Sequence, residues 1–199
     1  MILSDGEIEA KVASGAIVIE PFDKRCIQPA SYDLHLDRQF KIFRPHKTEV
    51  IDTKEPVKDL MEDVLLEKGD CFVLHPKSFA LGLISETTGV DNCHVGRLEG
   101  KSSLARLGLL IHTTAGFLDP GNSLKLTLEL FNASPLPIKL YPGMKIAQIA
   151  FENLGAECKV PYGVEKGSSY YGVDHIQESQ MHKNFDNFDE KTGMFNPKV

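Results

Sequence analysis

The chain has 199 residues, of which 42% are hydrophobic and 25% charged, a balance that is ordinary for a globular protein. Its length suits one domain, or one domain with a tail. The formal net charge of −6 argues against a general electrostatic attraction to nucleic acid or to an anionic membrane. The N-terminus lacks the basic and apolar regions of a signal peptide, and no apolar run approaches the ~20 residues of a membrane helix. We therefore expect a cytoplasmic protein that binds neither nucleic acid nor membrane.

The first predicted element is a short helix near the N-terminus. Ser4-Asp5-Gly6-Glu7 fits a capping box, and Ile8 and Val12 lie four residues apart, on one helix face. Gly15 is expected to end this helix.

Helical periodicity is weak after Gly15, and short apolar or alternating segments bounded by Pro, Gly, Asp or Asn take its place. Many short strands of this kind predict a mainly β fold with a few short helices, as a distorted β-barrel, jelly roll or sandwich. The charged segment 54–66 is expected to hold a helical turn or an exposed insertion. The predicted strands cover residues 17–19, 32–36, 71–74, 79–85, 126–131 and 144–151.

The composition changes at Gly163, where Gly, Ser, Tyr, Asp, Asn and Lys replace most aliphatic residues. We expect a β domain over residues 1–162 and a flexible C-terminal tail over 163–199. The tail is either solvated or forms, in its first part, a lid over a ligand. Composition alone favours a solvated tail.

The cysteines suggest neither a disulfide framework nor a zinc site. They are far apart and form no C-x-x-C pair, so each is expected to pack as a small apolar residue. The four are Cys26, Cys71, Cys93 and Cys158.

The segment Gly96–Gly108 carries the clearest chemical signal. Ser102 and Ser103 precede a Leu-Ala-Arg-Leu run, which predicts a short helix capped by one of these serines. Free N–H groups at a helix start suit phosphate, and Lys101 and Arg106 add positive charge. The alternative is a capped helix that carries two surface cations. The segment is not a Walker A loop, because the G-x-x-x-x-G-K-[ST] spacing is missing.

A polar turn and a strand follow this segment. Asp119 belongs to an Asp-Pro-Gly sequence and could simply cap that turn. In the next strand Leu128 and Leu130 share one face, and Glu129 lies on the other. Glu129 is therefore either exposed to solvent or faces a pocket. In a pocket, desolvation would raise its pKa and suit it to proton transfer near neutral pH.

Together these segments resemble the dCTP deaminase family of the dUTPase-like superfamily. The resemblance is carried by residues 1–5, Gln28–Asp33, Gly96–Asp119 and Gly143–Gln148. It implies a dUTPase-like distorted β-barrel or jelly-roll subunit, a homotrimer with active sites between subunits, and Mg²⁺ that arrives on the nucleotide phosphates. It also implies deamination without zinc, in agreement with the missing H-x-E and P-C-x-x-C motifs.

The resemblance also implies roles for individual residues. Glu129 matches the general base and acid, which would take a proton from the water that attacks cytosine C4 and then protonate N3 and the leaving ammonia. Ser102 and Arg106 match residues that hold the water, the base and the catalytic carboxylate. Asp119 matches the carboxylate that binds the deoxyribose 3′-OH. The other substrate-binding positions are Ala115, Gly116 and Phe117 at the base, Lys101, Ser103 and Gln148 on the phosphate side, and Tyr162 and Tyr170 near the nucleotide.

Gly116 distinguishes two branches of the family. The Thr-Ala-Gly-Phe-Leu-Asp sequence that ends at Asp119 matches the bifunctional branch, which deaminates dCTP and also hydrolyses the α–β phosphate link to give dUMP and pyrophosphate. The other branch carries a bulky His after Thr-Ala and releases dUTP. The alternative for Gly116 is a turn that needs a flexible backbone.

The tail departs from the family pattern at two positions. Ser169 stands where Lys is expected, and Val173 stands where Gln is expected. Losing one charge-assisted phosphate contact costs about 1.5–3 kcal/mol. Either other cations, such as Lys166 or Lys183, replace these contacts, or the substrate carries fewer phosphates. Tyr170 still fits the family, so the resemblance favours a lid in the first part of the tail.

Several functions remain open at this level. A single-step dCTP deaminase that gives dUTP and a dCMP-preferring deaminase are both compatible with the altered tail. A pure dUTPase conflicts with the intact Ser-Ser-Leu-Ala-Arg sequence. A catalytically idle nucleotide sensor would be expected to lack Glu129 or Arg106, and a sugar-binding jelly roll leaves residues 101–106 unexplained. The expected substrates are thus dCTP and dUTP, with dCMP as an alternative.

Overall fold

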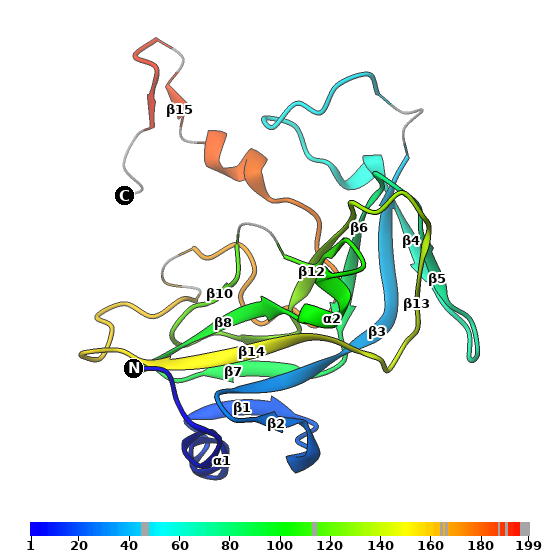
Figure 1. Ribbon diagram of the computed structural model, residues 1–199. Coiled ribbons are helices and arrows are strands. Elements are labelled where there is room, and N and C mark those ends of the chain that lie inside the picture. The colour runs from blue at the N-terminus through cyan, green and yellow to red at the C-terminus, as the bar shows by residue number, and fades with distance from the viewer. Residues whose placement is uncertain are drawn as a thin grey trace.

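The computed structural model describes residues 1–44, 48–112, 115–163, 165, 167–186, 188–189 and 191–195 (Figure 1). Short helices accompany many strands. The helical elements are α1 (Asp5–Ser14), η1 (Lys24–Cys26), η2 (Lys58–Leu60), α2 (Ser102–Ala105) and η3 (Met181–Phe185). The strands are β1 (Ile17–Glu20), β2 (Ile27–Gln28), β3 (Ser31–Phe43), β4 (Met61–Leu65), β5 (Phe72–Leu74), β6 (Phe79–Ile84), β7 (Thr87–Val90), β8 (His94–Gly100), β9 (Leu109–Leu110), β10 (Phe117–Leu118), β11 (Ser123–Leu124), β12 (Thr127–Asn132), β13 (Ile138–Leu140), β14 (Lys145–Asn153), β15 (Phe188–Asp189) and β16 (Met194–Phe195).

One curled antiparallel sheet dominates the fold. Its strands run in the order β10-β8-β14-β3-β6-β12-β9, and β2 and β4 pair with β3 beside this path. The long strand β3 joins the two halves, with β14 on one side and β6 on the other (Figure 1). The pairings of β3 with β6 and with β14 each contain a register shift, and such irregularities bend a sheet. The prediction of a mainly β, distorted-barrel fold with a few short helices is confirmed.

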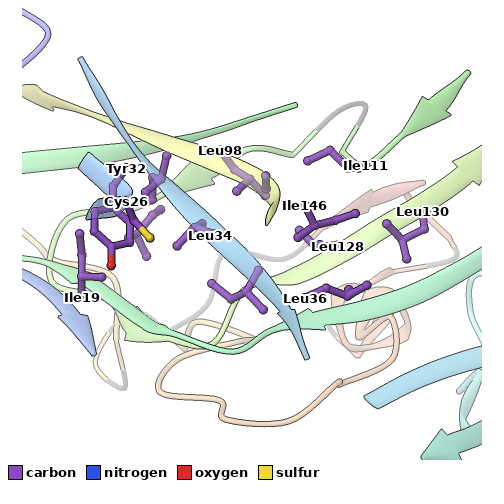
Figure 2. Packing of buried hydrophobic residues seen from close by; sticks show 14 of the residues in the cluster. Ile19, Cys26, Tyr32, Leu34, Leu36, Leu98, Ile111, Leu128, Leu130 and Ile146 are labelled. Carbon is purple, nitrogen blue, oxygen red and sulfur yellow. The ribbon is translucent and has the colours of Figure 1, made fainter. Parts of the chain in front are cut away.

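The core lies inside the curl of this sheet. Side chains from β3, β8, β12 and β14 meet there (Figure 2). Leu128 and Leu130 on β12 are fully buried, whereas Thr127, Glu129 and Phe131 alternate with them on the other face and are half-buried. The period-two pattern in the sequence therefore identified the core face of this strand correctly. All six predicted strands are present, with ends that differ by a few residues and a longer β3.

The N-terminal helix begins and ends as predicted. The backbone N–H of Ser4 donates to Glu7 Oε2 at 2.8 Å, and Ile8 is fully buried. Gly15 follows the helix with a φ of 79°, in the left-handed region that glycine adopts without steric cost.

The charged segment 54–66 contains more regular structure than expected. The predicted helical turn is present as η2, but it leads directly into β4, a strand that was not predicted. Met61 is buried and Val64 half-buried, while Glu62 and Asp63 face solvent. The sequence Met-Glu-Asp-Val-Leu shows no regular apolar–polar alternation, so only the pairing with β3 reveals the strand.

The four cysteines are free thiols. Cys26 is buried, as expected, but Cys93 is exposed, so the prediction that each cysteine packs as a small apolar residue is wrong for Cys93. No helix in the described part of the chain is long and apolar enough to cross a membrane.

Candidate active site

A cavity of about 470 Å³ lies between the outer face of β12, the segment around β10, and the C-terminal segment. Glu129 reaches it from β12, next to the paired strand β6. The structure thus brings together side chains that lie far apart in the sequence. Six of the predicted site residues line this cavity: Ala115, Phe117, Asp119, Glu129, Tyr162 and Tyr170.

The carboxylate of Glu129 faces the cavity because β12 buries its leucines on the opposite face. Its Oε2 lies 3.1 Å from Nδ1 of His112, which also lines the cavity. The His112 side chain is 8% exposed, and both ring nitrogens are buried without a hydrogen bond to any described residue, since the contact to Glu129 is close but poorly aligned. No site role was predicted for His112 from the sequence. Its position in a polar turn was the available signal for a site role.

The backbone around Gly116 packs tightly against β8. The N–H of Leu98 donates to the carbonyl of Gly116 at 2.8 Å. A Cβ atom at Gly116 would lie 2.9 Å from the Leu98 carbonyl oxygen and 3.3 Å from Cδ2 of His112. Gly116 does not have a positive φ. A close approach between backbone segments therefore explains this glycine, and the alternative of a flexible turn does not.

A second group of predicted residues lies outside the cavity, around the buried carboxylate of Asp33. The ammonium of Lys101 pairs with one oxygen of this carboxylate, and Lys145 Nζ lies 2.9 Å from the other. Burial alone would raise the pKa of Asp33, but the hydrogen bonds from the two lysines outweigh it and hold the pKa below its usual value. Gln148 is fixed nearby, because it donates to the Gly100 carbonyl at 3.1 Å and accepts from Ser31 at 2.9 Å.

The helix α2 presents Ser102, Ser103 and Arg106 to solvent. The predicted serine cap is wrong: Lys101 occupies the N-cap position, and α2 begins at Ser102 without a side-chain capping bond. The chain is still extended at Lys101, with a ψ of 127°, so both serines fall inside the single helical turn. Lys101, Ser102, Ser103, Arg106 and Gln148 do not line the cavity that holds Glu129.

The first part of the tail covers the cavity. Tyr162 and Tyr170 line it, and the Tyr162 hydroxyl accepts from the backbone N–H of Tyr170 at 3.1 Å. Val173 also lines it, and its carbonyl accepts from the N–H of Lys125 at 2.9 Å. Neither Ser169 nor the exposed Lys183 lines the cavity, and Lys166 lies outside the described residues.

In the described ranges, no three His, Cys, Asp or Glu side chains are grouped so that they could hold a metal ion.

The curled antiparallel sheet is an architecture also found in a solved enzyme structure. The crystal structure of 2′-deoxycytidine 5′-triphosphate deaminase from Agrobacterium tumefaciens matches with a TM-score of 0.60 and 23% sequence identity. The match covers 77% of this chain and 46% of that one. At this identity the likeness shows a common fold.

The sequence comparisons show more than a common fold. A family model described as dCTP deaminase-like matches residues 2–154. A "dCTP deaminase, dUMP-forming" from Beutenbergia cavernae is 46% identical over 186 residues, which cover 93% of this chain and 97% of that protein. The protein of the same name from Tropheryma whipplei (strain Twist) is 47% identical over 186 residues, 93% of this chain and 95% of its own length. The chain therefore belongs to the dCTP deaminase-like family, and the resemblance found in the sequence is confirmed.

Proposed function

We propose that the protein converts dCTP to dUMP, by hydrolytic deamination of the base and hydrolysis of the α–β phosphate link. The sum is dCTP and two waters giving dUMP, ammonia and pyrophosphate. The observation that carries this proposal is Glu129, which faces a cavity lined by Ala115, Phe117 and Asp119 in a chain about 46% identical to proteins of that name. A deaminase that releases dUTP has less support, because those relatives are described as dUMP-forming.

In the deamination step Glu129 acts as general base and then as general acid. It takes a proton from water as the water oxygen bonds to cytosine C4, and it passes that proton to N3. A second proton, from the new hydroxyl, goes to the 4-amino group, and the C4–N bond breaks to release ammonia and leave a carbonyl. His112 Nδ1 lies 3.1 Å from the Glu129 carboxylate, and this contact limits where the carboxylate can lie.

The base and sugar occupy the cavity, and the phosphates extend from it. Ala115 to Phe117 contact the base, Asp119 binds the 3′-hydroxyl, and Tyr162 and Tyr170 close over the nucleotide. These assignments are supported by the position of all these residues around one cavity.

The site is completed by a second copy of the chain, in a homotrimer. Ser102 and Arg106, which the chemistry needs beside Glu129, are exposed on α2 and do not line the cavity of their own chain. Exposed apolar side chains lie next to α2 and at the cavity: Leu107, which follows α2, is 58% exposed, and Phe117, which lines the cavity, is 61% exposed. A rotationally symmetric ring would bury them and bring α2 of one copy to the cavity of the next.

The phosphates are bound by Lys101, Ser103 and Gln148, of which Lys101 and Gln148 lie with Lys145 beside Asp33. Magnesium that arrives on the nucleotide would supply positive charge that offsets the charge of the phosphates. The donor set fits this arrangement, because the buried Asp33 carboxylate is already paired with two ammonium groups.

Gly116 supports the dUMP-forming branch. A histidine there would have to displace the Leu98 carbonyl, which lies 2.9 Å from an added Cβ. The packing of this segment therefore leaves no room for a side chain at position 116.

The chain divides into a catalytic β domain, residues 1–162, and a tail, residues 163–199, whose first part is a nucleotide lid. The contacts of Tyr170 and Val173 over the cavity support this division. A role in deoxynucleotide metabolism further implies action in the cytoplasm.

The test is to incubate the purified protein separately with dCTP, dUTP, dCMP and dUMP, with and without magnesium, and to resolve the products by ion exchange. Formation of dUMP and pyrophosphate from dCTP is expected, together with cleavage of dUTP. Accumulation of dUTP would assign the single-step reaction, and turnover of dCMP alone would assign a monophosphate substrate. No reaction with any of the four would overturn the proposal.

A further inference from the structure

Several side chains of the C-terminal segment line the cavity outside the predicted site positions, and two of them carry buried polar atoms that lack a hydrogen-bond partner among the described residues. These two are Gln177 and His182. The Oε1 atom of Gln177 and the Nδ1 atom of His182 are both buried, and neither forms a hydrogen bond with any described residue. Buried polar atoms in folded proteins are nearly always paired, so an unpaired atom that lines a cavity needs a partner from outside the chain.

The segment that carries these two side chains is docked on the β domain. Ile176 is 4% exposed and packs with Met61, Leu81 and Leu83 in a cluster of its own. On either side of it, the backbone is fixed by hydrogen bonds. The Val173 carbonyl accepts from the N–H of Lys125, and the Tyr170 hydroxyl accepts from the N–H of Gln180 at 3.0 Å.

An ion pair between Lys41 and Glu178, at 2.7 Å, adds to this docking. The Lys41 and Glu178 side chains are 12% and 14% exposed, so water screens the pair only weakly. Gln177 lies between the anchored residues Ile176 and Glu178, and its direction is therefore set by the docking.

The charges that line the cavity suit a nucleoside better than a phosphate chain. Among the described residues that line it, three carry carboxylates, Glu55, Asp119 and Glu129, and one is a lysine, Lys125. That lysine already lies 3.7 Å from the carboxylate of Asp37. A triphosphate would be repelled here, whereas the uncharged edges of a base and a deoxyribose would not.

We propose that Gln177 and His182 are substrate-binding residues, which the docked tail presents to the base and deoxyribose of the nucleotide. This inference rests on the proposed function, since it takes the cavity as the nucleoside site. A primary amide carries both a donor and an acceptor. Gln177 can therefore pair with the 4-amino group of cytosine and, after deamination, with the 4-oxo group of uracil. The tail, which lacks the Lys and Gln expected at positions 169 and 173, thus binds the base and deoxyribose instead of the outer phosphates.

The test compares four alanine variants of the full-length protein. Gln177→Ala and His182→Ala remove the proposed contacts. Gln180→Ala and His175→Ala are matched controls, because neither side chain lines the cavity: Gln180 donates to the Glu178 carbonyl, and His175 is exposed beside Asp174. Calorimetry gives the Kd for dUMP, which does not react further, and steady-state kinetics give KM and kcat for dCTP.

Each of the two test variants is expected to raise the Kd for dUMP and the KM for dCTP by about 3–10-fold, as for loss of one neutral hydrogen bond. Their kcat values stay within about twofold of wild type, and both controls match wild type. Affinities equal to those of the controls would overturn the inference, as would a fall in thermal stability with unchanged nucleotide affinity. A loss seen for dCTP but not for dUMP would assign the contacts to the outer phosphates and overturn the nucleoside assignment.

The same titration separates this inference from the proposed function. A wild-type protein that binds dUMP but does not turn over dCTP would refute the function and leave the variant comparison intact. A wild-type protein that does not bind dUMP would overturn both.

Discussion

In the proposed homotrimer, Glu129 of one copy and Arg106 of the next are expected to act in one active site. Glu129 faces the cavity of its own chain, and Arg106 is exposed outside it. Glu129→Gln removes the proposed general base and is expected to lower kcat about 10²–10⁴-fold. Arg106→Ala removes the charged group proposed to orient the water and the carboxylate, and a loss in kcat of about 10²–10³-fold is expected. Each variant alone is therefore nearly inactive.

Mixed trimers of these two variants should recover activity by a defined amount. In a ring where each site takes Glu129 from one copy and Arg106 from the next, any trimer that contains both variants has one intact site of its three. Co-expression with two different affinity tags, followed by purification on both, isolates the mixed trimers. Their dUMP formation from dCTP is expected at about one third of wild type per trimer.

The control pairs Arg106→Ala with Ser102→Ala. Both residues lie on α2, so one copy supplies both to a given site, and no mixed trimer of this pair has an intact site. Recovery in the control, or no recovery in Glu129→Gln and Arg106→Ala trimers of verified composition, would refute the reasoning that the site is shared between subunits.

Three further predictions concern the cavity wall, the tail and Asp33. Gly116→Ala should destabilise the fold by about 1–3 kcal/mol, because the new Cβ meets the Leu98 carbonyl, which cannot rotate away; an unchanged Tm in thermal unfolding would contradict this. Ile176→Asp should undock the tail and raise the KM for dCTP about tenfold, because the docked state becomes the minor one; kinetics and limited proteolysis measure this, and wild-type protease resistance would count against it. The pKa of Asp33 is lowered in the folded state. The stability that this carboxylate contributes to the fold is therefore fully present above the unfolded pKa of about 3.9, and it is lost as the pH falls through the folded pKa. The Asp33→Asn variant should therefore lose less unfolding free energy than the wild type as the pH falls below about 4. The same loss in both proteins, measured by denaturant titration at several pH values, would exclude this role.

Local patterns in the sequence predicted much of the fold. The capping box at Ser4 and the glycine at Gly15 predicted the first helix, and the alternation at Leu128 and Leu130 predicted the buried face of β12. These signals are reliable because a helix or strand has a fixed repeat, so each apolar residue indicates a face. The strand β4 was not predicted because its sequence, Met-Glu-Asp-Val-Leu, shows no regular alternation, and its pairing with β3 decides its conformation.

The candidate site was predictable only as a set of residue types. Glu129 was identified from its position in a leucine-rich strand, but whether it faced solvent or a pocket depended on which segments cover β12. His112 was missed as its neighbour, because the 3.1 Å contact joins residues 17 positions apart through the packing of two segments. Gln177 and His182 lie in a polar tail whose composition resembles that of a solvated chain.

The sequence by itself therefore determined the family, the mainly β class and the faces of individual strands, since these depend on residue types and short-range periodicity. Only the tertiary structure decided that Glu129 faces a cavity, that Ser102 and Arg106 do not line it, and that Gly116 is needed for a close backbone approach. It also decided that the tail packs over the cavity through Ile176. The physical reason is that these properties are contacts between distant segments, and a contact depends on long-range pairing and burial that no local pattern encodes.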